Sequence, residues 1–400
     1  MARRVFLHIG APKTGTSYLQ TLLRANPETL AAQGVLLPGN RGDHFRFRLA
    51  VAELLDVVER RPEAYTAWDR VLEETQAWPE TVVITNELLC TATEEQAKRT
   101  MDALAPAQLH VIYTVRDLAR TVPAEWQQSL KAGGTVSMGR FVQRLTARPA
   151  GPSDSGLEDP GADSDRAEVF FARHDIPRVL SRWGAGLDAE RVHVVTVPPA
   201  GSDPDVLWRR FAGVLGVDPA SCVEPDHQVN ESLGAVEAEL LRRVNVVLKR
   251  AGDYGRSRRE WVRHNLALGI LAGRPDPVRF ALGPEQHAWA VDTACDMVEA
   301  IRGQGYDVVG DLDDLIPDRA PSTARYSDNV DEAEINSAAV DTIAELAVRL
   351  HTRRRAGRAR AAKLDRLRGR VAELKKQVRG TGREVAQQPR RSRRREFNPK

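Results

Sequence analysis

Residues 5 to 18 read VFLHIGAPKTGTSY, and this stretch decides the fold. Val5 to Ile9 form a short apolar run typical of a buried strand, and Leu19, Leu22 and Leu23 follow at helical spacing. The glycine-containing segment between them joins the two. We therefore expect a strand, a glycine loop and a helix from Thr16 to Ala25, which ends before Pro27.

Three further segments predict buried strands because they are nearly continuous in branched apolar residues. They are Thr81–Thr85, Leu109–Val115 and Val192–Val197. Helical patterns separate them, among them residues 53–58, residues 67–78 and a helix starting near Pro123. Strands of this kind alternating with helices predict an α/β fold, a doubly wound parallel sheet covered on both faces.

Changes in composition along the chain indicate where its domain, linker and tail begin and end. We expect an α/β domain over 1–316, with a mobile insertion at 149–165 that is rich in Pro, Gly, Ser and Asp. Its second half, 235–302, is mostly helical and is closed by a segment at 306–312. A polar linker at 317–335 and a basic helical or partly disordered tail at 336–400 follow.

The tail has a strongly positive net charge, whereas the rest of the chain is acidic. Residues 351–400 hold 19 Lys and Arg against 4 Asp and Glu, whereas residues 1–350 hold 39 against 51. Apolar residues in one 3,4-spaced register over 343–378 indicate a coiled-coil-like helix able to pair with itself or a partner, interrupted at Arg353, Gly357 and Arg360. The arginine runs suit an anionic surface, either nucleic acid or a membrane, although a solvated tail explains them equally.

The overall composition excludes several classes of protein. The 400 residues are 42% apolar, with a mean hydropathy of −0.41 and no run long enough to span a bilayer. The amino terminus lacks the apolar core of an export signal, so we expect a cytoplasmic protein with no transmembrane segment. Cys90, Cys222 and Cys295 are far apart and form no disulfide or zinc pattern.

The glycine loop has the chemistry of a phosphate site. Backbone N–H groups at a helix N-terminus converge on an anion, and Lys13 adds a cation. The common nucleotide-binding loop places its lysine directly after the second glycine, whereas Lys13 precedes Gly15. This order argues against a standard nucleoside triphosphatase.

The segment from Pro12 to Tyr18 resembles the 5′-phosphosulfate-binding loop of sulfotransferases that use 3′-phosphoadenosine 5′-phosphosulfate (PAPS). Val115-Arg116-Asp117, followed by Pro123-Ala124-Glu125-Trp126, is similar to the 3′-phosphate-binding strand and helix of that family. Thr85-Asn86-Glu87 is similar to the region of its catalytic base. Segments near 194–199 and 207–216 extend the resemblance to about residue 315.

The resemblance implies the role of each matching residue. Lys13 would contact the oxygen that bridges phosphate and sulfate, and Arg116 would pair with the 3′-phosphate, which suits a bidentate guanidinium. The 5′-phosphate and the adenine would be bound by Thr14, Gly15, Thr16, Ser17 and Tyr18. The family usually has a serine eight residues after the arginine, where this chain has Ala124; Ser129 is a possible substitute.

Sulfuryl transfer needs positioning, charge stabilisation and a base, and no metal when a lysine supplies the charge. Glu87, just past a predicted parallel strand, lies where open sheets bind ligands and is the first candidate base. His44 is the second. Asn230 and Ser232 would orient a ligand or cap the following helix.

The resemblance implies an acceptor hydroxyl or amine. The sequence does not decide whether this group belongs to a small molecule, a carbohydrate or a lipid. Two alternatives to a sulfotransferase remain at this stage. One is a kinase or other nucleotide phosphotransferase with a related loop, and the other is a non-catalytic scaffold with an anion-binding tail.

Overall fold

The computed structural model describes residues 2–40, 42–52, 63–147, 166–224, 232–252, 255–318, 325–326 and 329–386. The expected insertion at 149–165 and the expected helix at 53–58 lie outside these residues. The chain divides into two compact units, Met1–Asn336 and Ser337–Lys400. The first unit contains the sheet and all of the predicted site residues.

Six strands of the first unit form one sheet in which every neighbouring pair is parallel. In spatial order they are β2 (Val35–Leu36), β3 (Thr81–Thr85), β1 (Arg4–Gly10), β4 (Gln108–Val115), β5 (Val192–Thr196) and β7 (Asp307–Val309). The expected parallel α/β fold is therefore confirmed. The four strands predicted from apolar runs lie in the centre, and the segment at 306–312 supplies the edge strand β7. The two-residue β2 was not predicted.

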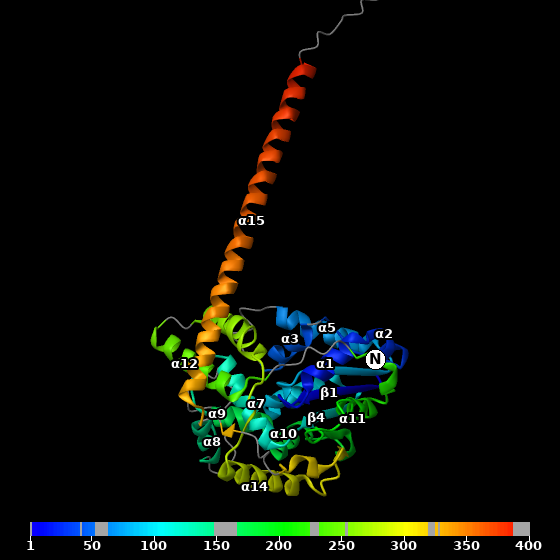
Figure 1. Cartoon of the computed structure of the whole chain (residues 1–400). Helices are drawn as coiled ribbons and strands as arrows, with labels where there is room; N and C mark the ends of the chain where they lie inside the picture. Colours follow the sequence, from blue (N-terminus) through cyan, green and yellow to red (C-terminus); the bar gives the residue numbers. More distant parts are fainter. Residues whose placement is uncertain are drawn as a thin grey trace, which may run out of the picture. The chain divides into compact units, whose positions relative to one another are not determined.

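Helices connect the strands (Figure 1). They are α1 (Thr16–Ala25), α2 (Pro27–Ala32), α3 (Asp43–Val51), α5 (Glu63–Ala77), α6 (Glu94–Leu104), α7 (Leu118–Lys131), α8 (Met138–Thr146), α9 (Arg166–His174), α10 (Ile176–Trp183), α11 (Val206–Leu215), α12 (Ala235–Arg250), α13 (Arg256–Trp261) and α14 (Pro284–Ile301). Single turns lie at Leu89–Thr91 (η1), Ala189–Arg191 (η2), Pro219–Ser221 (η3), Leu271–Gly273 (η5) and Leu312–Leu315 (η6), and a π-helical segment, η4, at Val262–Ala267. A second, two-stranded sheet pairs β6 (Phe280–Ala281) with β8 (Arg325–Tyr326).

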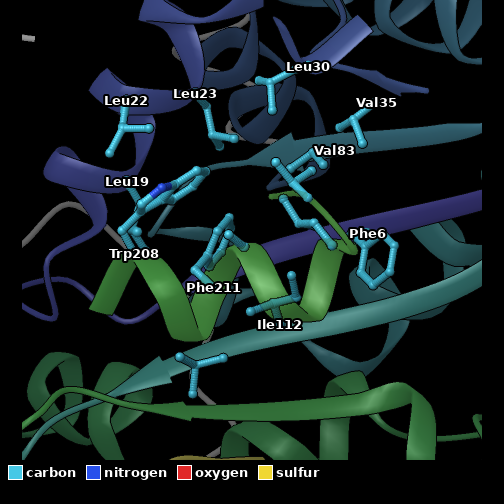
Figure 2. Packing of buried hydrophobic residues seen from close by; sticks show 14 of the residues in the cluster. Phe6, Leu19, Leu22, Leu23, Leu30, Val35, Val83, Ile112, Trp208 and Phe211 are labelled. Atoms are coloured by element: carbon cyan, nitrogen blue, oxygen red, sulfur yellow. The ribbon is translucent and has the colours of Figure 1, made fainter. Parts of the chain in front are cut away.

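Helices α1 and α11 cover one face of the sheet. Figure 2 shows Leu19, Leu22 and Leu23 of α1 facing Trp208 and Phe211 of α11, above strand side chains. The strand residues of this cluster include Phe6, Val83, Ile112 and Val195. These residues are almost completely shielded from solvent, so the cluster holds the start of α1 rigidly over the end of β1.

The opposite face of the sheet is also covered. Tyr113 and Val115 of β4 border a hollow that Ile176 of α10 and Ala294 of α14 line from the other side. The sheet is thus covered on both faces. β3 and β5 are buried over their whole length and β1 over all but its first residue, as nearly continuous apolar runs require.

The strand order places a binding crevice at the end of β1. The chain builds β2 and β3 on one side of β1 and β4, β5 and β7 on the other. Ligands of open α/β sheets bind at the carboxyl ends of the strands where this order reverses. The glycine loop follows β1, Glu87 follows β3 and Arg116 follows β4, so the fold brings these three segments to one edge.

Helix α7 begins earlier than we expected from Pro123. It starts at Leu118, and Pro123 lies inside it. Asp117 explains the difference, because its side chain accepts a hydrogen bond from the Arg120 backbone N–H at 2.9 Å and thereby caps the helix. The wrong boundary came from giving a proline signal more weight than an acidic cap.

The second unit consists of most of α15 (Glu332–Ala386), a helix that starts inside the segment expected to be a linker. It runs without a break through Arg353, Gly357 and Arg360, where we expected its register to be interrupted. Ile343, Leu350, Leu364, Leu367 and Val371 are each more than half exposed on it. Self-pairing through this helix stays a prediction.

Candidate anion-binding site

The glycine loop is an open cradle of backbone donors. Gly10, Lys13 and Gly15 have φ angles of 117°, 66° and 82°, which turn the chain sharply between β1 and α1. The N–H groups of residues 13–17 make no hydrogen bond to the part of the chain that the structure describes. Consecutive N–H groups at the start of a helix form an anion site, so the loop has the geometry expected for phosphate.

Two glycines are required by close packing. A Cβ on Gly10 would lie 2.3 Å from the carbonyl oxygen of Glu87, and one on Gly15 would lie 2.4 Å from Cδ2 of Leu207. Because Gly10 has no Cβ, the backbone of Glu87, which follows β3, can pack directly against the loop. This contact holds Glu87 beside the cradle.

A buried polar network supports the loop from below. His8 Nδ1 lies 2.8 Å from Thr85 Oγ1 and Nε2 lies 3.3 Å from Thr114 Oγ1, while Thr114 Oγ1 donates to Gly10 O at 2.9 Å. Complete burial lowers the pKa of His8 to about 3, so the ring is neutral at pH 7. The Thr14 hydroxyl belongs to this network, at 2.5 Å from Ala11 O, and only its backbone faces the cradle.

Lys13 is held at the entrance of the loop. Its Nζ donates to Gln128 Oε1 of α7 at 2.9 Å. Burial lowers the pKa of Lys13, Glu125 and Glu87 act in the opposite direction, and Arg263 lowers it further. An amine in this position is suited to stabilise charge that develops on a bound anion.

More cations surround this amine. Lys131 ends α7 one turn beyond Gln128, and burial together with Lys13 and Arg263 lowers its pKa to about 8. Arg263 lies on the π-helical segment η4, which packs against α7. Anions are therefore favoured at this end of the sheet.

Glu125 of α7 is a buried carboxylate beside these cations. Arg173 Nη1 lies 3.1 Å from its Oε2, and His174 Nε2 lies 3.5 Å from its Oε1. Burial alone would raise the pKa of Glu125, but His174, Arg173 and Lys13 lower it to about 2. Glu125 is therefore ionised at pH 7 and balances part of the local positive charge.

Glu87 faces the same space from the end of β3. It is half-buried, and Gln20 Nε2 of α1 donates to its Oε2 at 3.0 Å. The adjoining backbone is fixed, because Asn86 N–H donates to His8 O and the Cys90 thiol to Glu87 O. The carboxylate is thus positioned to accept a proton beside the loop.

His44 is placed differently from Glu87. Thr85 N–H donates to its Nδ1 at 3.1 Å, and its Nε2 lies 2.7 Å from Pro38 O, which assigns the proton to Nε2. Burial lowers the pKa of His44 to about 4. Both ring nitrogens are used by backbone groups, so His44 fixes α3 to the end of β3 and the geometry favours Glu87 as the base.

Arg116 lies across the loop from Glu87. Its Nη1 donates to Lys13 O at 3.1 Å, while its Nε is buried without a partner in the described part of the chain. Burial and then Arg120 lower the pKa of Arg116 to about 10. A buried guanidinium with an unused donor is what a phosphate partner would satisfy.

The remaining sequence candidates have partly different surroundings. Thr16 is buried at the start of α1 and Ser17 is exposed there. Tyr18 donates from its hydroxyl to Glu224 at 2.5 Å, and burial and Glu224 raise its pKa. Ala124 is half-buried on α7, as is Ser129 one turn later.

The expected caps of α12 are not seen. Gly234 is the N-cap residue of this helix, and no side-chain hydrogen bond caps it. Ser232 is exposed two residues earlier, and Asn230 lies outside the described residues.

Sequence reasoning missed the roles of several residues, namely Gln20, Arg48, Gln128, Lys131, Arg173, His174 and Arg263. A partial signal was present: residues 125, 128 and 131 recur every three positions and share one face of α7. The partners from α3, α9 and η4 carried no local signal, because only folding brings those segments to the loop.

The described residues contain no group of three or more His, Cys, Asp or Glu arranged to hold a metal ion. They also contain no helix that is both long and apolar enough to cross a membrane.

Comparisons with known proteins add little. No protein-family profile and no curated protein matches the chain. A crystal structure of a sulfotransferase from Alicyclobacillus acidocaldarius is similar at 18% identity and a TM-score of 0.34, over 66% of this chain and 97% of that one. At this level of likeness we draw no conclusion about this chain from that structure.

Proposed function

We propose that this protein is a sulfotransferase, which moves a sulfuryl group from PAPS to a hydroxyl or amine acceptor. One observation carries the proposal: the N–H groups of residues 13–17 and the Nε of Arg116 have no partner among the described residues, and they lie with Lys13 at the ends of the adjacent strands β1 and β4. A donor with phosphates at both ends of a nucleoside needs two separate anion sites of this kind.

The residues present fit such a donor. The loop N–H groups would bind the 5′-phosphate, and Arg116 would bind the 3′-phosphate through its unused Nε. Ala124 offers no hydroxyl to the 3′-phosphate. Elsewhere on α7, the side-chain amide of Gln128 accepts a hydrogen bond from Lys13. The ring of Tyr18, beside the loop, would cover the adenine.

Transfer breaks the bond between sulfur and the phosphate oxygen and forms one between sulfur and the acceptor oxygen or nitrogen. Negative charge develops on the leaving phosphate oxygen, which Lys13 stabilises. The acceptor proton passes to Glu87, a carboxylate fixed beside the loop through Gly10. 3′-Phosphoadenosine 5′-phosphate and the sulfated acceptor are the products.

Calorimetry with 3′-phosphoadenosine 5′-phosphate tests the binding half of the proposal. We expect the wild-type protein to bind it and Arg116→Gln to bind it about tenfold or more weakly, as for a lost charged hydrogen bond. Arg209→Gln is the matched control, because this arginine is exposed and pairs with Asp203. No binding by a folded wild-type protein would refute the proposal, and tight binding of ATP with Mg²⁺ instead would favour a phosphotransferase.

Labelled PAPS and a panel of carbohydrate, lipid and small-metabolite acceptors test transfer. We expect Lys13→Ala to lower the rate on the order of 100- to 1000-fold, because one charge-stabilising group is lost. Glu87→Gln should also lose activity while it retains nucleotide binding. His44→Gln should mainly lower stability; loss of transfer with unchanged stability would make His44 the base.

A further inference from the structure

Arg48 of α3 is held over the same crevice by the helix that carries it. His44, one turn earlier, fixes α3 to Thr85 at the end of β3, and residues i and i+4 share one helix face. The other end of α3 is fixed by α6, since Arg99 donates to Val51 O at 2.9 Å and Gln96 to Ala52 O at 3.0 Å. Arg48 is thus placed by a rigid element.

Arg48 has no partner of its own. In the part of the chain that the structure describes, its guanidinium makes no hydrogen bond and no ion pair, and its Nε is buried. Burial lowers the pKa of Arg48, and the neighbouring Arg173 lowers it further, while Cys90 and Glu87 act in the opposite direction. A guanidinium carries five N–H donors, and leaving a buried one such as the Nε–H of Arg48 unsatisfied is costly.

Arg173 of α9 extends this feature. One of its nitrogens, Nη1, is paired with Glu125, but its Nε is also buried without a partner among the described residues. Arg48 and Arg173 are close enough to affect each other's charge, Glu87 lies within the same range of Arg48, and each arginine has an Nε without a partner among the described residues. Both would be satisfied by one anionic group with several acceptor oxygens.

This anion is not expected to be a phosphate of the donor. The donor sites proposed above lie on the loop after β1 and on Arg116 after β4, whereas Arg48 comes from the β3 side, with Glu87. The base must lie next to the acceptor group that loses its proton, so the space near Glu87 belongs to the acceptor.

Resting on the proposed function, we infer that the acceptor carries an anionic group, a carboxylate, sulfate or phosphate ester, near the hydroxyl or amine that receives the sulfuryl group, and that Arg48 and Arg173 bind it. Arg48 is then a specificity-determining residue. It selects acidic acceptors over neutral ones, because a neutral acceptor would leave the buried guanidinium unsatisfied.

Binding of inorganic sulfate tests the inference on the full chain. The protein is first saturated with 3′-phosphoadenosine 5′-phosphate, which fills the loop, and is then titrated calorimetrically with sodium sulfate against sodium chloride at equal ionic strength. We expect the wild type and Arg209→Gln to bind sulfate and Arg48→Gln to bind it about tenfold or more weakly. Arg48→Lys should recover part of the affinity.

The outcomes separate the two proposals. Failure to bind the nucleotide refutes the proposed function, whereas nucleotide binding with equal sulfate affinity in the wild type and Arg48→Gln overturns the inference. Comparison of PAPS with 3′-phosphoadenosine 5′-phosphate adds a second check. If Arg48→Gln weakens binding of PAPS alone, Arg48 contacts the sulfuryl group of the donor and the acceptor assignment is wrong.

Discussion

Two arginines, Arg210 beside β5 and Arg48 beside β3, differ in how far their hydrogen-bond donors are satisfied. Arg210 of α11 donates to Thr196 O at 2.7 Å, to Thr196 Oγ1 at 2.9 Å and to Asp314 Oδ2 at 2.7 Å. Arg48 makes no such contact with the described residues. Beside β5 the chain satisfies its own cation, while beside β3 it leaves donors for a ligand. Stability and binding should therefore respond differently to substitution in the two regions.

The largest loss of stability is expected when the buried ion pair between Glu125 and Arg173, near the candidate site, is broken. Glu125→Gln would leave Arg173 as poorly partnered as Arg48, and loss of one member of a buried pair lowers the free energy of unfolding by about 3 to 5 kcal/mol. Urea unfolding at pH 7 measures this. Asp102→Asn, which breaks an exposed pair with Lys98, is the control and should change stability by less than about 1 kcal/mol.

The same carboxylate gives a prediction for pH. The pKa of Glu125 is about 2 in the folded protein and about 4.5 unfolded, so its contribution is complete above pH 4.5 and is lost as the pH falls toward 2. The stability of the wild type should fall more steeply over this range than that of Glu125→Gln. Parallel pH profiles of the two proteins would show that Glu125 is not the ionised partner of Arg173.

An intermediate loss of stability is expected when Arg210 loses its carboxylate partner. Asp314→Asn removes the charged acceptor of Arg210 and should lower the free energy of unfolding by about 2 kcal/mol. Binding of 3′-phosphoadenosine 5′-phosphate, measured by calorimetry, should stay within about twofold of the wild type. A large loss of nucleotide binding would mean that the edge of the sheet also serves the ligand.

The smallest change in the free energy of unfolding, in the opposite direction, is expected when Arg48 is replaced. Arg48→Met replaces an unpartnered cation with an apolar side chain of similar length, so stability should be unchanged or increase by up to about 1 kcal/mol. Sulfate binding should still be lost. A clear decrease of the urea midpoint would show that Arg48 has a structural role, and the contrast with Arg210 would fail.

The central strands were predictable because each is buried on both faces and so reads as an unbroken apolar run. Thr81–Thr85 has the predicted bounds, and the other three strands differ from theirs by one residue at one or both ends. The start of α7 was predicted wrongly, since the cap formed by Asp117 depends on one side-chain hydrogen bond. The strand β2 has two residues, too few to form a pattern.

The candidate site was predictable only in its local part. Lys13 and the glycines lie within one turn of chain, where spacing alone indicates an anion cradle. The sequence already ranked Glu87 ahead of His44 as the candidate base. The structure adds a physical reason, because both ring nitrogens of His44 are used by backbone groups from other segments. Arg48, Arg173 and Gln128 could not be ranked from the sequence, since each reaches the site from a different helix.

The sequence by itself determined the parallel α/β sheet and the phosphate-type loop after β1, because periodicity and glycine spacing act over a few neighbouring residues. The tertiary structure decided which charges are satisfied. Glu125 and Arg210 find partners, while the Nε atoms of Arg48 and Arg116 have none among the described residues. Pairing and burial depend on contacts between segments far apart in the chain, and these contacts set the free energy of each charge.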